Sequence, residues 1–111
     1  MVKSYSEQQI DDWFYDNGWY AVYEPTIVIN NEEFKPDWVL WPQRDFDKPI
    51  IVEYWGLLRE QVSPWVIKKK ERYLARKEYK ENIYSGSDNY YFVGVLPHQI
   101  DIIEELLEEL L

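Results

Sequence analysis

The residues Ile50-Ile51-Val52-Glu53-Tyr54-Trp55-Gly56 form a nearly continuous apolar run that a glycine ends. Such a run predicts a central strand, from Ile50 to Trp55, that is buried on both faces, because a strand exposed on one face alternates apolar and polar residues. Glu53 is the one acid inside this run. A buried charge costs free energy unless a partner compensates it, so Glu53 is a candidate functional residue.

A second unusual acid, Asp37, lies upstream in a predicted strand from Glu33 to Trp41. The polar stretch from Pro42 to Pro49 then predicts a loop. Residues that are equally distant from the centre of an antiparallel hairpin face each other, and Asp37 and Glu53 are equally distant from Asp45. The natural register therefore pairs the two acids across adjacent strands.

Two facing carboxylates call for a cation between them. Directly facing side chains have Cβ atoms about 4.5–5.5 Å apart, where like charges destabilise a sheet. The chain has no cysteine and a single histidine, His98, far from both acids in sequence, so oxygen atoms must supply the ligands. Oxygen ligands favour Mg²⁺ or Mn²⁺ over Zn²⁺. The alternative interpretation makes Asp37 a strand-edge charge and pairs Glu53 with a lysine of the basic segment described below.

The remaining elements follow from caps, turns and periodicity. Ser4 and Glu7 fit a capping box that opens a helix ending near Asp16-Asn17-Gly18. A strand from Trp19 to Ile29 precedes an Asn30-Asn31 hairpin turn. A long helix over about 59–82, a strand over 90–96 and a helix from residue 97 complete the chain. The expected order is αβββαβα, in one α/β domain over residues 1–111 with a mixed central sheet flanked by helices.

The net charge of −9 is unevenly distributed. Eight of the twelve Lys and Arg residues lie between Arg59 and Lys80, against three acidic residues, so a surface for nucleic acid has to be built around this segment. The residues expected to contact nucleic acid are Lys69, Arg72, Arg76, Lys77 and Trp65. The alternative is a basic helix face that only water contacts.

Helix periodicity selects Lys70 as the cation of the carboxylate site. At about 100° per residue, Lys70 and Lys77 lie between the two flanks of the apolar face, whereas Lys68 points the opposite way. A lysine in the middle of a core-facing stripe must extend toward an anionic group, and the carboxylate pair supplies one. The alternative is that its methylenes cover apolar surface while the ammonium reaches water.

Composition also bears on location and assembly. No uninterrupted apolar run reaches the roughly 20 residues of a membrane-spanning helix, and the N-terminus has no apolar signal core. With no cysteine, a soluble, cytoplasmic protein is the simplest expectation, including one that a virus or mobile element encodes. The Ile and Leu stripe of the last helix is expected to pack on the sheet or on a second copy in a homodimer.

Three segments together resemble the PD-(D/E)XK nuclease superfamily: Pro36-Asp37, Glu53-Tyr54-Trp55-Gly56 and Lys70-x-x-Tyr73, set in an αβββαβ order. The likeness extends to small nuclease domains with Pro-Asp and Glu-Tyr-Trp-Gly segments and to Holliday-junction resolvases. The resemblance implies a restriction-endonuclease-like fold. It also implies a metal-dependent DNA nuclease that hydrolyses the backbone with Mg²⁺-activated water, in replication, recombination or repair.

The resemblance implies roles for individual residues as well. Asp37 and Glu53 would bind Mg²⁺ or Mn²⁺, and Glu7 on the first helix would complete the metal shell, directly or through water. Trp55 stands where the superfamily has its strand lysine, so catalysis requires Lys70 to take that role from the following helix. The alternative function is a non-catalytic acidic interaction protein, either an inactivated nuclease fold or a mimic of DNA. The net charge of −9 and the missing strand lysine favour it.

Overall fold

The computed structural model describes residues 4–56 and 64–111, with the backbone alone over residues 64–70. Within these ranges the chain forms an α/β fold with a mixed sheet, as the sequence predicts. The elements are, in chain order, α1 (Tyr5–Asp16), β1 (Ala21–Tyr23), β2 (Ile27–Ile29), β3 (Glu32–Phe34), β4 (Trp38–Leu40), β5 (Ile50–Tyr54), α2 (Pro64–Ser85), β6 (Tyr91–Val95), the 3₁₀ helix η1 (Pro97–Ile102) and α3 (Ile103–Glu108).

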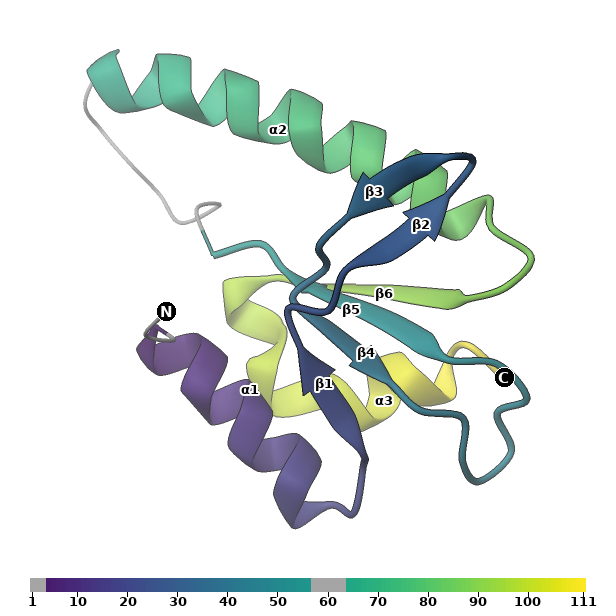
Figure 1. Cartoon of the computed structure of the whole chain (residues 1–111). Helices are drawn as coiled ribbons and strands as arrows, with labels where there is room; N and C mark the ends of the chain where they lie inside the picture. The colour runs from purple at the N-terminus through teal and green to yellow at the C-terminus, as the bar shows by residue number, and fades with distance from the viewer. Residues whose placement is uncertain (1–3, 57–63) are drawn as a thin grey trace.

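The central sheet has the strand order β1-β4-β5-β6. β4 runs antiparallel to β1 and β5, whereas β6 runs parallel to β5 and follows it through α2. β5 is therefore an interior strand, and its residues Ile50, Ile51 and Val52 are fully buried, which confirms the prediction from the apolar run. The helices α1 and α3 lie on one face of the sheet, and α2 crosses the other (Figure 1).

Each of the two strands predicted before the polar loop is broken into two short strands, which corrects the expected continuous pair. Glu24 adopts a positive φ of 49° just before Pro25, and Pro36 lies at the matching break on the other side. Proline has no N–H to donate to the ladder, so pairing does not continue through these positions. β1 and β4 stay in the central sheet, while β2 and β3 form a separate two-stranded ribbon beside α2 (Figure 1).

One register nevertheless runs through both parts of this hairpin. Tyr23 faces Trp38 in the central sheet, and Ile29 faces Glu32 in the ribbon, so both pairings share the same turn. At that turn Asn30 and Asn31 have φ values of 54° and 65°. Two consecutive positive φ values are typical of a type I′ turn, which confirms the Asn-Asn hairpin turn.

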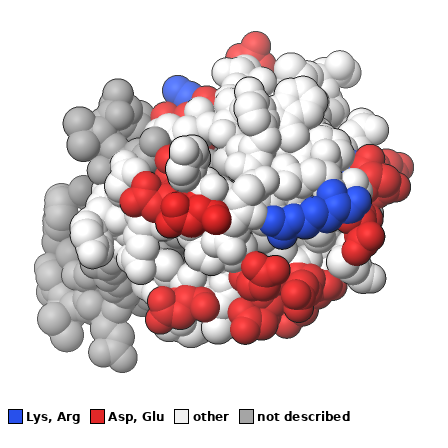
Figure 2. All heavy atoms as spheres, turned by 90° about the horizontal axis from the view of Figure 1, so that it is seen from below, with Lys and Arg blue, Asp and Glu red and all other residues white. Residues whose placement is uncertain are grey.

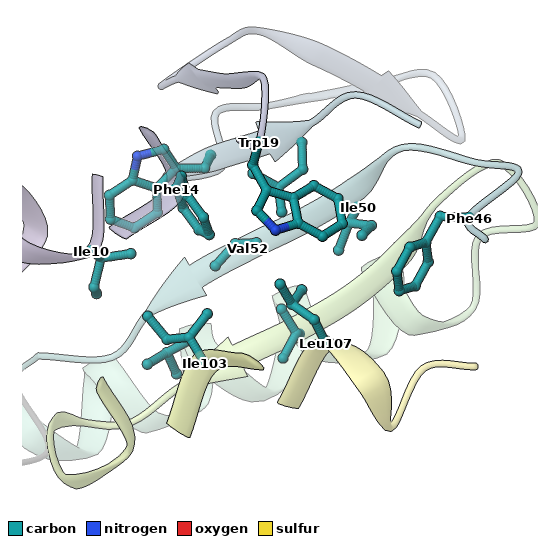
Figure 3. Packing of buried hydrophobic residues seen from close by; sticks show 12 residues of the cluster. Ile10, Phe14, Trp19, Phe46, Ile50, Val52, Ile103 and Leu107 are labelled. Atoms are coloured by element: carbon teal, nitrogen blue, oxygen red, sulfur yellow. The ribbon is translucent and has the colours of Figure 1, made fainter. Parts of the chain in front are cut away.

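The interior strand β5 separates two hydrophobic clusters. The larger cluster lies between the sheet and the helices α1 and α3 (Figure 3), and it includes Ile10, Phe14, Val52, Ile103 and Leu107. The smaller cluster lies under α2 and the β2–β3 ribbon, and it consists of Ile29, Phe34, Ile51 and Tyr84. Because side chains alternate along a strand, Glu53 shares the face of Ile51 and points toward α2.

The C-terminal segment begins as a 3₁₀ helix rather than an α-helix, and α3 starts only at Ile103. The predicted apolar stripe is partly confirmed, because Ile103 and Leu107 are buried whereas Ile102 is 41% exposed. Over the part of the chain that the structure describes, no helix is both long and apolar enough to cross a membrane.

Candidate active site

Asp37 immediately precedes β4, and Glu53 lies near the end of β5. The β4–β5 register pairs Trp38 with Val52, and one further step along both strands places Asp37 opposite Glu53. Their carboxyl groups share a hydrogen bond, and Asp37 also accepts one from the Tyr54 backbone N–H at 2.7 Å. The pairing of the two acids that the sequence predicts is therefore confirmed.

Glu53 lies in a polar niche beneath α2. Its side chain is only 4% exposed, and the Lys80 ammonium lies 4.0 Å from its Oε1 atom. The Tyr84 hydroxyl donates a hydrogen bond to the same oxygen at 3.3 Å. Glu53 thus faces Asp37, as the strand register predicts, and it also pairs with a lysine of the basic segment, as the alternative interpretation expects. Two carboxyl groups share one ammonium group among the described side chains, which leaves the niche short of positive charge.

Burial is the main reason that both acids of the pair hold protons more tightly than usual. Burial, followed by the charge of Asp37, raises the pKa of Glu53 to about 8. Burial also raises the pKa of Asp37, although the Tyr54 N–H bond lowers it. The same desolvation, together with the charge of Glu53, raises the pKa of the Tyr84 hydroxyl. Near neutral pH the carboxyl pair therefore retains a proton unless another cation replaces it.

Glu7 lies close to this pair but makes a different contact. The Glu7 carboxylate accepts a hydrogen bond from the Tyr23 hydroxyl at 3.0 Å, and the Glu7 backbone N–H donates to Ser4 Oγ, which caps α1. The charge of Glu7 raises the pKa of Asp37. Within residues 4–56 and 64–111, no three His, Asp or Glu side chains are grouped closely enough to hold a metal ion. Of the three acids expected to bind the metal, the structure brings Asp37 and Glu53 together, whereas Glu7 bonds to Tyr23.

Two cavities flank the carboxyl pair. The first has a volume of about 530 Å³ and opens between the start of α1 and the ends of β4 and β5, where Glu7, Asp37, Tyr54 and Tyr73 line it. The second has a volume of about 370 Å³ and lies between β3 and α2, where Lys35, Arg76 and Lys80 line it. Asp37 thus faces the first cavity, and the lysine that contacts Glu53 faces the second.

The lysine predicted for the site, Lys70, lies outside the described side chains, as do Lys69 and Trp65. All of these residues belong to the first turns of α2, where only the backbone is described. Among the described side chains, the cation in contact with Glu53 is Lys80, farther along the same helix. The sequence contained a signal for this residue, because Lys80 follows Lys77 by three positions and so lies near the same helix face.

The other basic residues of α2 differ in their surroundings. Arg72 and Arg76 are exposed, and Arg76 lines the second cavity. Lys77 forms an ion pair with Glu81 on its own helix, and its ammonium lies 5.4 Å from the centre of the Trp55 ring. Arg72 and Arg76 are therefore placed to meet an anionic partner directly, whereas Lys77 already has two partners.

No protein-family model matches the chain, and no curated protein matches it in sequence.

Proposed function

We propose that this chain is a metal-dependent DNA nuclease of the PD-(D/E)XK type with a restriction-endonuclease-like fold. The observation that carries the proposal is the contact between the carboxyl groups of Asp37 and Glu53 on adjacent strands, with the Lys80 ammonium 4.0 Å from Glu53. The resemblance in Pro36-Asp37 and Glu53-Tyr54-Trp55-Gly56 supports the same function. The order of the helices and strands is consistent with it.

The donor set fits Mg²⁺ or Mn²⁺. Both donors are carboxylate oxygens, which Mg²⁺ and Mn²⁺ prefer, and a divalent cation in place of the shared proton would allow both acids to be ionised. When bound, such an ion would stabilise charge on a scissile phosphate and lower the pKa of water. The hydrogen bond from the Tyr54 backbone N–H holds the Asp37 carboxylate in place. The Tyr84 hydroxyl and the Lys80 ammonium hold the Glu53 carboxylate in place. Glu7, on the wall of the same cavity as Asp37, is assigned an assisting role.

Lys80 takes the role that the resemblance assigns to a lysine. Its side chain is 19% exposed, so the ammonium touches Glu53 and still lines the open second cavity. From that position it can stabilise negative charge on a phosphate beside the carboxyl pair. The side chain of Lys70 lies outside the described residues, and a contribution from it is compatible with this assignment.

A cleavage assay tests the proposal. The purified chain is incubated with single-stranded, duplex, flap and four-way-junction DNA in Mg²⁺ or Mn²⁺, and we expect at least one substrate to be cut. Asp37→Asn and Glu53→Gln should each lower the cleavage rate by at least about 100-fold, because they remove a metal ligand. Asp45→Asn, an exposed acid of the intervening loop, is the matched control and should cleave normally.

The assay also has outcomes that contradict the proposal. Cleavage that persists unchanged in Asp37→Asn would identify a contaminating nuclease. Failure to cut any of the substrates would refute the enzymatic function.

A non-catalytic acidic interaction protein is the second candidate. The face formed by α1 and α3 favours it, because Asp and Glu residues gather there with few Lys or Arg among them (Figure 2). Glu104, Glu105 and Glu108 of α3 are all exposed. Such a protein would mimic a polyanion and would need no metal, so a measurement of metal binding separates the two candidates.

A further inference from the structure

The cavity beside Asp37 has an aromatic wall. Tyr5, Tyr54 and Tyr73 line it, and Tyr5 is 87% exposed. The Tyr54 ring lies directly against the backbone of Gly56, since a Cβ atom at position 56 would be 2.7 Å from Tyr54 Cε2. The absence of a side chain at Gly56 is therefore what allows the Tyr54 ring to form this part of the wall. Aromatic rings that border a cavity beside a phosphodiesterase site can stack on nucleobases.

The charges of the two cavities differ in a way that orients a strand of DNA. The described lining of the cavity beside Asp37 carries two carboxylates, Glu7 and Asp37, and no Lys or Arg. The described lining of the second cavity carries three cations, Lys35, Arg76 and Lys80, against two acids, Glu32 and Glu33, which leaves one positive charge in excess. Phosphates are attracted to the second cavity, whereas the uncharged base is the part of a nucleotide that suits the first. Asp37, one acid of the carboxyl pair, lines the first cavity, and Lys80, which contacts the other acid, Glu53, lines the second.

A base inside a duplex cannot occupy the aromatic cavity. Both faces of a paired base are covered by its neighbours, and its hydrogen-bonding edge is engaged by the opposite strand, so it must leave the stack to enter. A second strand would also bring its phosphates toward Glu7 and toward the acidic face of α1 and α3 (Figure 2). Both effects disfavour duplex DNA at this site.

We infer that the cavity lined by Tyr5, Tyr54 and Tyr73 receives an unpaired base of the substrate, and that the chain acts on single-stranded in preference to duplex DNA. This inference rests on the proposed nuclease function. In the bound strand, one base stacks against the tyrosine wall while the adjoining phosphates run past the carboxyl pair toward Arg76 and Lys80.

Binding measurements on the Asp37→Asn chain test the inference without cleavage. Fluorescein-labelled oligonucleotides of one sequence, single-stranded and duplex, are titrated in Mg²⁺ and followed by fluorescence anisotropy. We expect the single strand to bind at least about ten-fold more tightly than the duplex. Adding Tyr5→Ala should weaken single-strand binding about five-fold or more, since it removes a stacking face. Adding Tyr15→Ala should change nothing, because Tyr15 is a similarly exposed tyrosine at the other end of α1, 84% accessible.

An abasic substitution makes the test specific for a base. We compare two losses of affinity. The first is the loss when a strand that lacks one base binds the protein with Tyr5 intact, and the second is the loss when the complete strand binds Tyr5→Ala. The two losses should be equal. The two losses should not add, because both remove the same stacking contact. Circular dichroism melting of each variant verifies folding, and the exposure of Tyr5 predicts an unchanged melting temperature.

The outcomes separate the inference from the proposed function. If the wild-type chain cleaves DNA but binds duplex as tightly as single strand, or if Tyr5→Ala and Tyr15→Ala behave alike, the inference is overturned while the nuclease function stands. If the wild-type chain cleaves no DNA, both are overturned.

Discussion

Glu53 combines three properties that rarely occur together in one side chain. It is almost fully buried, it shares a hydrogen bond with another acid, and among the described side chains it contacts one lysine, at 4.0 Å. A site selected only for stability would place an apolar residue here, because a buried ion pair seldom stabilises a protein more than well-packed apolar side chains do. The position of Glu53 is therefore best explained by a function that needs a carboxylate.

The raised pKa of Glu53 predicts a pH dependence of stability in the absence of metal. In the unfolded chain the glutamate has its ordinary pKa near 4.5, whereas the native pKa is about 8. The native state therefore binds more protons between these values, and the contribution of Glu53 to stability is lost as the pH rises through this window. In EDTA, the unfolding free energy of the wild type should fall between pH 5.5 and 8.5 relative to that of Glu53→Gln, as measured by urea denaturation. A difference that stays constant across the window would show that Glu53 titrates normally.

Lys80 gives a second prediction for a single residue. Lys80→Ala should lower the single-turnover cleavage rate by about 100-fold, because it removes the ammonium group beside the carboxyl pair. Lys80→Arg keeps the charge and should recover part of the rate. The control is Lys48→Ala, which removes a lysine whose ammonium lies over the Tyr91 ring. A wild-type rate in Lys80→Ala would remove Lys80 from the proposed mechanism.

The elements that build the site are the broken hairpin and α2. Because Pro25 and Pro36 interrupt the ladder, the β2–β3 ribbon leaves the sheet, and Phe34 packs against Tyr84 with ring centres 5.5 Å apart. The ribbon also contacts α2 through the Tyr79 hydroxyl, which donates to Glu32 at 2.6 Å. These contacts hold the C-terminal half of α2 beside Glu53. Phe34 and Tyr79 also line the second cavity, the one that contains Lys80.

The Asn30-Asn31 turn fixes this ribbon, and its backbone predicts how substitutions act. Both residues have positive φ, so Asn31→Val should destabilise the fold by about 1–2 kcal/mol, because a β-branched residue is strained there. Asn31→Gly should be neutral or stabilising, since Asn-Gly is a favoured type I′ pair. Urea denaturation measures both values. Equal losses in the two variants would show that the positive φ is not what the turn requires.

Across the whole molecule, the charge is divided between two sides. The α1–α3 side is acidic, as Figure 2 shows, while the basic residues gather on α2, on the opposite side of the sheet. With a net charge of −9, the chain repels polyanions at long range. The proposed DNA substrate would therefore approach from the α2 side, where Arg72 and Arg76 are exposed.

Metal binding should be visible in the stability of the whole chain. In the proposed function, Mg²⁺ or Mn²⁺ would bind the native carboxyl pair and not the unfolded chain, so a concentration of 100 times Kd should stabilise the fold by about 2.7 kcal/mol. For a domain of this size the melting temperature should rise on the order of 10 °C. NaCl at the same ionic strength controls for screening of the net charge, and Glu53→Gln should show no metal-specific rise. The non-catalytic alternative predicts no rise for the wild type either.

The sequence alone was sufficient for the features that depend on short stretches of chain. The apolar run of β5, the Asn-Asn turn and the equal spacing of Asp37 and Glu53 about Asp45 predict the strand pairing and bring the two acids together. These features follow from turn chemistry and from the two-residue period of a strand, which act between neighbours in sequence. The pairing of the candidate ligands is therefore predictable without coordinates.

Only the tertiary structure decided which lysine contacts the pair, where Glu7 makes its hydrogen bond, and that the hairpin breaks in two. Helix periodicity places Lys70, Lys77 and Lys80 near one face, but it does not tell which turn of α2 crosses the sheet at Glu53. The packing of Tyr84 against Phe34 and Phe92 sets that crossing point. These contacts join residues far apart in sequence, so no local pattern contains them.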